Sequence, residues 1–145
     1  FDNKICILRP TLIYGPGDTH SGYGPNKFLK LAKKNQDIIL FGKGEEKRDH
    51  IYIDDLIEIL IECIKKNKIG VFNIVSGKVH SFKSIAKKII LLTKSKSKII
   101  NTKRIGKMPH NGYRPFNINY IKKNFKNLKI NTIDQGIKKY IKELN

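Results

Sequence analysis

The sequence predicts an α/β fold in one compact domain. Segments with alternating or continuous β-branched residues, typical of strands, take turns along the chain with segments that repeat apolar residues every three or four positions, as helices do. The chain has 145 residues and is 39% hydrophobic, which suffices for one core and is too short for two full-sized domains. No stretch approaches the ~18 uninterrupted apolar residues of a membrane helix, so no membrane insertion is expected.

The first third of the chain predicts three strands and a helix. Residues 4–8 alternate and are β-branched, which predicts a strand that ends in a loop rich in glycine and proline. Apolar residues at helical spacing predict a short helix over residues 26–34. Residues 38–41 and 49–53 are strand-like on either side of the turn at residues 42–44, Gly-Lys-Gly, so we expect these two strands to form a β-hairpin.

A second helix and a further strand are expected in the middle of the chain. Asp54 has the position of an N-cap for a helix that runs to about residue 66. Its apolar positions predict one buried stripe. They are Leu56, Ile57, Leu60, Ile61 and Ile64. Residues 71–75 form an almost unbroken apolar run, which predicts a strand covered on both faces.

The last third predicts two capped helices and a long loop. Ser81 precedes a helix-like segment and is its expected N-cap. Residues 99–100 suggest a short strand, and residues 101–116 carry the glycines and prolines of a loop. Thr132 and Gln135 have the spacing of a capping box ahead of the final helix.

The strong positive charge allows a nucleic-acid-binding function. The formal net charge is +18, which is typical of proteins that bind nucleic acid or another anionic surface. The lysines, however, are spread along the whole chain, at positions where helical faces meet solvent, and the chain is rich in Lys, Ile and Asn together. A solvated basic surface is therefore favoured, with no specific nucleic-acid partner, and nucleic-acid binding remains the alternative.

Cysteine and histidine usage indicates neither a disulfide framework nor a metal site. Cys6 and Cys63 lie in apolar surroundings without motif spacing, which is typical of a reducing cytoplasm. The histidines are scattered without the paired spacing of metal ligands, so no metal is predicted.

The arginines suggest an anion-binding site. They are Arg9, Arg48, Arg104 and Arg114, among 30 cationic residues. All of them fall at predicted strand ends or in loops, and the planar guanidinium is suited to bidentate capture of phosphate or carboxylate. For Arg48 alone, a salt bridge to Asp49, Asp54 or a neighbour is as reasonable as an anion contact. The recurrence of arginine at loop mouths favours the anion pocket.

Five segments in order resemble one enzyme family. They are LRPTLIYGPGD (8–18), GYGPNKF (22–28), ILFGKGEEKRDHIYIDDL (39–56), FNIVSGK (72–78) and NGYRPF (111–116). This succession resembles the C-terminal half of NAD-dependent epimerase/dehydratases, the extended short-chain dehydrogenase/reductase enzymes that act on nucleotide sugars. The resemblance implies the last strands of a Rossmann-like sheet together with a small substrate-binding subdomain.

The resemblance assigns roles to particular residues. It places the backbone of Pro10 and Thr11 near the nicotinamide, as the cofactor-binding part of this chain. It places the ring of Phe41 beside the nucleobase, although ordinary core packing is a nearly equal alternative for that residue. It implies that Arg48 and Arg114 hold the diphosphate of the nucleotide sugar, with Asp49 and Asp54 fixing the expected hairpin that carries Arg48.

One position departs from the family pattern. Many members have an asparagine two residues after the proline of the LRP-type motif, where it contacts substrate, and this chain has Leu12. The identity of the sugar therefore cannot be transferred. Asn26 or Asn117 is left to supply a polar group, and Asn26 is taken as the candidate.

Two features of the family's chemistry are not assigned to this chain. No glycine-rich GxGxxG turn is present to receive the pyrophosphate of NAD. The catalytic Tyr-x-x-x-Lys pair is not assigned either: Tyr23 and Lys27 have this spacing, but Tyr23 lies in a predicted loop, and Tyr120 is followed by Asn124. We expect residues 1–145 to be the substrate-binding portion and the N-terminal dinucleotide-binding portion, with the catalytic residues, to lie outside this chain.

The function expected from the sequence is that of the substrate-binding half of a nucleotide-sugar epimerase or dehydratase. The complete protein would use NAD or NADP and could form a homodimer, and the chain alone is expected to be inactive. Two alternatives remain: a basic nucleic-acid-binding protein, and a non-catalytic remnant that binds nucleotide sugars.

Overall fold

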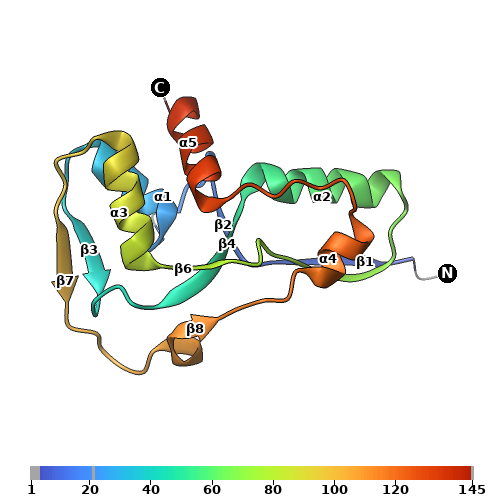
Figure 1. Ribbon diagram of the computed structural model, residues 1–145, viewed down its shortest axis with the longest axis horizontal. Helices are drawn as coiled ribbons and strands as arrows, with labels where there is room; N and C mark the ends of the chain where they lie inside the picture. Colours follow the sequence, from blue (N-terminus) through green and yellow to red (C-terminus); the bar gives the residue numbers. More distant parts are fainter. Residues whose placement is uncertain (1–3, 21, 145) are drawn as a thin grey trace.

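The computed structural model describes residues 4–20 and 22–144. Their strands are β1 (Cys6–Pro10), β2 (Leu12–Tyr14), β3 (Ile38–Phe41), β4 (Lys47–Tyr52), β5 (Gly70–Ile74), β6 (Val79–Ser81), β7 (Ile99–Thr102) and β8 (Tyr113–Arg114). Their helices are α1 (Pro25–Lys33), α2 (Ile53–Lys65), α3 (Phe82–Thr93), α4 (Asn119–Asn124) and α5 (Ile133–Glu143), with a 3-10 turn over Pro109–Gly112. The predicted α/β class is confirmed, because parallel strand pairs and helices alternate along the chain (Figure 1).

One end of the molecule is built on a parallel pair of strands. β1 and β5 pair in parallel, from Cys6 opposite Gly70 to Pro10 opposite Ile74, so both strands end at the same edge. Helix α2 runs alongside this pair (Figure 1) and contributes Ile59 and Cys63 to a buried cluster with Phe72 of β5. Helix α4 closes the same cluster.

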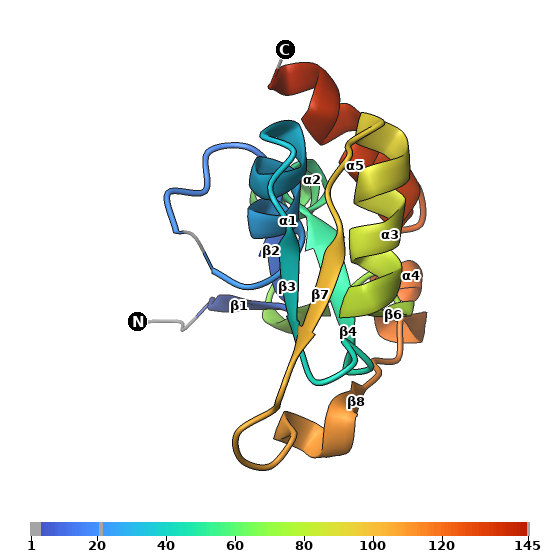
Figure 2. The same cartoon turned by 90° about the vertical axis from the view of Figure 1, so that its left-hand side faces the viewer.

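The other end is a second layered unit. Strands β3 and β7 pair in parallel and lie side by side, with α1 and α3 packed behind them (Figure 2). Phe28 of α1 and Ile85 of α3 are fully buried in the core between these elements, together with Leu40 of β3. Strand β4 joins the two ends, since Ile51 belongs to one core cluster and Tyr52 to the other.

The predicted β-hairpin is wrong. A tight turn is present, because the Gly44 N–H donates to the Phe41 carbonyl at 3.1 Å. The flanking strands nevertheless diverge: β3 pairs with β7, whereas β4 pairs with β2, β6 and β8. Each strand finds a more distant partner in the sequence, so the turn joins two different sheets. The residues of the turn do not determine which distant strands β3 and β4 pair with.

The buried stripe predicted for α2 is also wrong. The helix buries Asp55, Ile59 and Cys63, which are spaced one turn apart. Ile59 and Cys63 pack in the cluster that contains Phe72, whereas the Asp55 carboxylate accepts from Asn131. Of the predicted stripe, Leu56 is partly buried against this cluster, and the other four members are exposed: Ile57, Leu60, Ile61 and Ile64, the last to 69%. The helix is apolar on most sides, so its spacing alone cannot select the buried face.

The parallel pair is covered on one face only, contrary to the prediction for residues 71–75. Phe72 and Ile74 are buried, whereas Val71 on the same strand is exposed. Ile5 and Ile7 are also exposed, beside and on β1. Among the described strands, β1 has β5 as its single partner, so its other edge is open. This chain therefore presents an uncovered apolar sheet face next to an open strand edge.

Two of the three predicted helix caps are confirmed. The Ser81 hydroxyl accepts the Ser84 N–H at the start of α3. Thr132 and Gln135 form the full capping box of α5. Helix α2 instead begins after Tyr52 without a side-chain cap, so Asp54 lies within its first turn. Within the two described ranges, no helix is long and apolar enough to span a membrane.

Candidate functional site

Arg48 and Arg114 are brought together by strand pairing. β4 and β8 pair in parallel, with Lys47 opposite Tyr113 and Arg48 opposite Arg114. β4 is a continuous strand in the middle of the molecule, and β8 is a two-residue strand in the long loop after β7. The two arginines expected to act together are therefore neighbours in space.

Arg48 is held by three contacts. Its guanidinium donates to the Lys47 carbonyl at 2.9 Å and to the Pro109 carbonyl at 2.7 Å. It also forms an ion pair with Glu46 at 2.5 Å, and only 9% of its side chain is exposed. Arg48 therefore anchors the 3-10 turn that precedes β8.

The carboxylate beside Arg48 is that of a neighbour in the sequence, and neither that of Asp49 nor that of Asp54. Glu46 fills that position, while the Asp49 carboxylate accepts the N–H groups of Ser76 at 2.9 Å and Gly77 at 2.7 Å. Burial raises the pKa of Asp49, and these hydrogen bonds act in the opposite direction. Asp49 thus fixes the loop after β5, and its expected role in a hairpin is wrong. In the described part of the chain, Asp54 makes no ion pair with Arg48.

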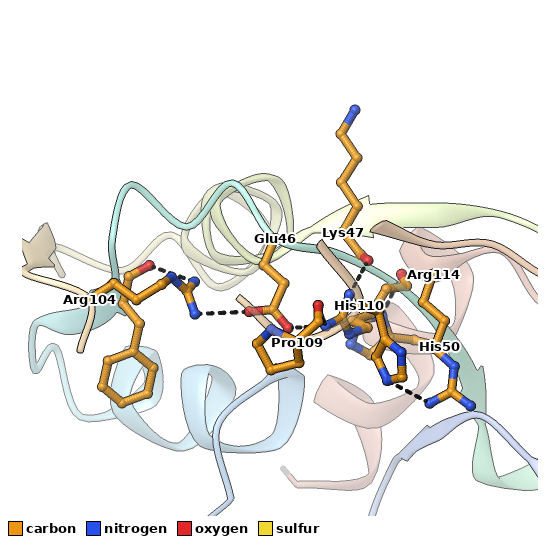
Figure 3. A network of polar contacts seen from close by, with 9 residues as sticks. Glu46, Lys47, His50, Arg104, Pro109, His110 and Arg114 are labelled. Atoms are coloured by element: carbon orange, nitrogen blue, oxygen red, sulfur yellow. Dashed lines mark hydrogen bonds and ion pairs between the residues drawn. The ribbon is translucent and has the colours of Figure 1, made fainter. Parts of the chain in front are cut away.

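Arg104 joins the same network from the loop after β7. Its Nη1 lies 3.1 Å from Glu46 Oε2, and its Nη2 donates to the Phe41 carbonyl at 3.4 Å. Figure 3 shows Glu46 between Arg104 on one side and Pro109, His110 and Arg114 on the other. The Nε atom of Arg104 is buried without a partner among the described residues. Sequence reasoning noticed Arg104 as a loop arginine but missed Glu46.

Phe41 lies at the end of β3 and outside both core clusters. Half of its surface is exposed, and its ring packs against Tyr23 with 4.8 Å between ring centroids. The Phe41 N–H donates to the Tyr23 hydroxyl at 3.3 Å. Tyr23 therefore packs against the Phe41 ring, while half of the Phe41 surface is exposed to solvent. A ring in this position offers a stacking surface to a planar ligand.

Arg114 is the accessible arginine of the pair. It is exposed, its Nη1 lies 3.2 Å from His110 Nε2, and its guanidinium sits 5.3 Å from the centroid of the Phe116 ring. Within the described ranges no carboxylate pairs with Arg114. Its guanidinium is thus oriented by His110 and Phe116 and remains available to an anion.

Asn26 is committed to the loop before α1. Its side-chain oxygen accepts the Gly15 N–H at 3.0 Å, and its amide nitrogen donates to Asp18 at 2.6 Å. It is buried and lines a cavity of about 120 Å³ with Leu12 and His50. Both ends of the Asn26 amide therefore already have protein partners.

His50 borders the same cavity and was not identified from the sequence. Its Nδ1 lies 3.2 Å from the Arg48 carbonyl, and its Nε2 is buried without a partner in the described structure. Burial lowers the pKa of His50 to about 4. The imidazole is therefore neutral near pH 7, with Nδ1 donating to the carbonyl and Nε2 left as an acceptor.

Pro10 and Thr11 lie where the parallel pair ends. The Thr11 N–H donates to the Ile74 carbonyl at 3.0 Å, and its hydroxyl donates to the Asp49 carbonyl at 2.9 Å. Ligands of open α/β sheets bind outside the carboxyl ends of parallel strands. The position of these residues fits the rim of such a ligand site.

The parallel strand pairs and the helices packed on them define an α/β protein. The sequence model of the NAD dependent epimerase/dehydratase family matches residues 1–75, just over half of the chain. The chain therefore belongs to this family.

Two curated relatives illustrate the similarity. The dTDP-D-glucose 4,6-dehydratase of Dictyostelium discoideum is 34% identical over 91 residues, which cover 62% of this chain and 21% of that protein. The UDP-N-acetyl-alpha-D-glucosaminuronate decarboxylase of Bacillus cytotoxicus is 30% identical over 110 residues, covering 73% of this chain and 34% of that protein. The chain thus spans about a fifth to a third of these relatives.

Solved structures show the same fold. An epimerase of Methanothermobacter thermautotrophicus matches 93% of this chain and 41% of its own, with a TM-score of 0.81 at 19% identity. A Bordetella bronchiseptica enzyme in complex with NADH matches 94% of this chain and 44% of its own, with a TM-score of 0.77 at 26% identity. The Rossmann-like fold of extended short-chain dehydrogenases is confirmed for this chain. Membership of this enzyme family does not favour the nucleic-acid-binding alternative.

Proposed function

We propose that this chain is the substrate-binding portion of an NAD-dependent nucleotide-sugar epimerase or dehydratase. Its own task is to hold the nucleoside diphosphate, while residues outside this chain perform hydride and proton transfer. The observation that carries the proposal is the register of Arg48 and Arg114 on β4 and β8. The sugar itself stays unassigned, because Leu12 replaces the polar residue that many members use there.

The diphosphate would lie against the exposed Arg114. Arg48 would support Arg114 in two ways. It would fix the 3-10 turn before β8 through the Pro109 carbonyl, and it would add positive potential near the diphosphate. The nucleobase would rest on Phe41, which Arg104 and Glu46 link to the same network. Solved relatives support this ligand class: a Thermotoga maritima UDP-glucose 4-epimerase, 19% identical with a TM-score of 0.79, contains UDP-glucose.

The cofactor portion would pack on the uncovered end of the molecule. Further parallel strands would pair with the open edge of β1, and their helices would cover the exposed Ile7 and Val71. The glycine-rich turn, which this sequence lacks, and the catalytic Tyr-x-x-x-Lys pair would belong to that portion. NAD would supply the hydride acceptor, and Pro10 and Thr11 would border its site. Asn26 would shape the substrate loop by fixing Gly15 and Asp18.

Calorimetric titration of the chain with UDP, dTDP and the matching nucleosides tests the proposal. The diphosphates should bind and the nucleosides should bind much more weakly. Arg114→Lys should weaken diphosphate binding by about tenfold, because lysine keeps the charge and loses the planar fork. Arg9→Lys is the matched control, since Arg9 lies on β1 at the other end of the molecule. Equal affinities for nucleosides and diphosphates, or equal effects of the two substitutions, would remove the basis of the proposal.

A further inference from the structure

Glu46 forms ion pairs with two arginines of the candidate site, Arg48 and Arg104. One oxygen of its carboxylate pairs with Arg48 at 2.5 Å, and the other pairs with Arg104 at 3.1 Å. Only 12% of the Glu46 side chain is exposed. A single, nearly buried carboxylate therefore neutralises one of two guanidinium groups and orients both.

Each arginine carries a different part of the candidate site. Arg48 donates to the Pro109 carbonyl, at the start of the turn that leads to Arg114. Arg104 donates to the carbonyl of Phe41, the proposed base platform. Figure 3 shows this row of contacts from Arg104 through Glu46 to Pro109. Glu46 thus connects the base side to the phosphate side.

We infer that Glu46 is a positioning residue that sets the distance between the base platform at Phe41 and the phosphate arginine Arg114. It acts through Arg104 and Arg48 and does not touch the ligand. This inference rests on the proposed function, because it names the residue that holds the segments of Phe41 and Arg114 together as one site. Glu46 then strengthens the binding of an anion through its contacts, although its own negative charge repels that anion.

Glu46→Gln separates these two effects. An amide presents one acceptor and one donor where the carboxylate presents two acceptors, so one guanidinium loses its partner and faces a second donor. The substitution also removes one negative charge. Positioning predicts weaker binding of UDP, and simple electrostatics predicts equal or tighter binding.

Glu45→Gln is the matched control. Glu45 is the neighbouring carboxylate, is exposed and accepts the Lys43 N–H at 2.7 Å, outside the two Glu46 ion pairs. The two substitutions change the net charge equally, so a difference between them reports contacts. Glu46→Asp adds a third variant, which keeps the charge but shortens the reach.

The experiment is UDP titration of the parent chain and these variants, with melting curves and amide hydrogen exchange over residues 103–114. We expect Glu46→Gln to weaken UDP binding about tenfold and to speed exchange in that segment, with an intermediate effect for Glu46→Asp and no loss for Glu45→Gln. If Glu46→Gln unfolds, Glu46→Asp provides the comparison. Glu46 variants that bind UDP like Glu45→Gln overturn the inference. If the parent binds no diphosphate, the proposed function fails. Equal exchange in the Glu46 and Glu45 variants then also overturns the positioning role.

Discussion

Arg48 and Arg114 lie opposite each other in the parallel pairing of β4 with β8, yet they are not equivalent. Arg48 is almost buried and bound to Glu46, Lys47 and Pro109, whereas Arg114 is exposed and oriented by His110 and Phe116. Arg48 thus contributes to structure as well as to the proposed site, and Arg114 is the direct candidate for contact with a phosphate.

Arg48→Lys should therefore reduce stability as well as ligand binding. A lysine cannot reach the Pro109 carbonyl and Glu46 in the same fork geometry, and hydrogen bonds to charged groups are worth about 1.5–3 kcal/mol each. We expect the free energy of unfolding to fall by about 1.5–3 kcal/mol. Urea denaturation measures this, with Arg114→Lys as the exposed comparison. Equal stabilities of the two variants would show that the Arg48 contacts contribute little to folding.

Phe41→Ala should weaken nucleotide binding without unfolding the chain. Half of the ring is exposed, so little core packing is lost. Aromatic stacking contributes about 0.5–1.5 kcal/mol, which corresponds to roughly a threefold to tenfold loss in affinity. The effect should appear with UDP and disappear with inorganic pyrophosphate, which has no base. An equal loss for both ligands would contradict the platform role.

His50 predicts a fall in stability in mild acid. Its pKa is lowered to about 4 in the folded chain from 6.5 in the unfolded chain, so the unfolded state binds more protons between these values. Stability is then full above pH 6.5 and decreases as the pH drops toward 4, by about 3 kcal/mol at most. His50→Asn should lose this part of the pH dependence, and His20→Asn, which changes an exposed histidine, should keep it. Urea denaturation at pH 7 and pH 4.5 makes the comparison. If the parent, His50→Asn and His20→Asn lost the same unfolding free energy between the two pH values, the pH dependence could not be assigned to His50.

The two faces of α2 should respond differently to truncation. Ile59 is fully buried and Ile64 is 69% exposed. Ile59→Ala should cost about 2–5 kcal/mol of unfolding free energy, and Ile64→Ala should stay within about 0.5 kcal/mol. Thermal and urea unfolding of the two variants provide the test. A large loss of unfolding free energy in Ile64→Ala would show that Ile64 is buried, as the apolar spacing of the sequence predicts.

The isolated chain should not turn over a nucleotide sugar. It lacks the glycine-rich turn that the resemblance assigns to cofactor binding. Tyr23 and Lys27 have the spacing of the pair that the resemblance assigns to proton transfer, but Tyr23 lies in the turn before α1. Incubation with NAD and UDP-glucose or dTDP-glucose, followed by chromatography of the products, checks this expectation. Any epimerised or dehydrated sugar would show that this chain carries a catalytic group of its own.

Local signals in the sequence predicted the elements better than their partners. Ser81 and the Thr132–Gln135 pair mark helix starts correctly, because a cap depends on residues a few positions apart. The partner of β3 could not be predicted, because β7 follows it after three other strands and two helices. The same limit applies to Glu46: in the run KGEEKRD it looks like any surface acid, and only folding places Arg104 against it.

The central claim is that a nucleoside diphosphate lies between Phe41 and Arg114. A two-dimensional NMR titration of the ¹⁵N-labelled chain with UDP tests it most directly. We expect UDP to shift the backbone signals of Phe41 and Tyr23 and the backbone and side-chain signals of Arg114. Uridine should shift the signals of Phe41 and Tyr23 and leave those of Arg114 unchanged. Shifts confined to the β1–β5 end of the molecule, or no shifts with UDP, would contradict it.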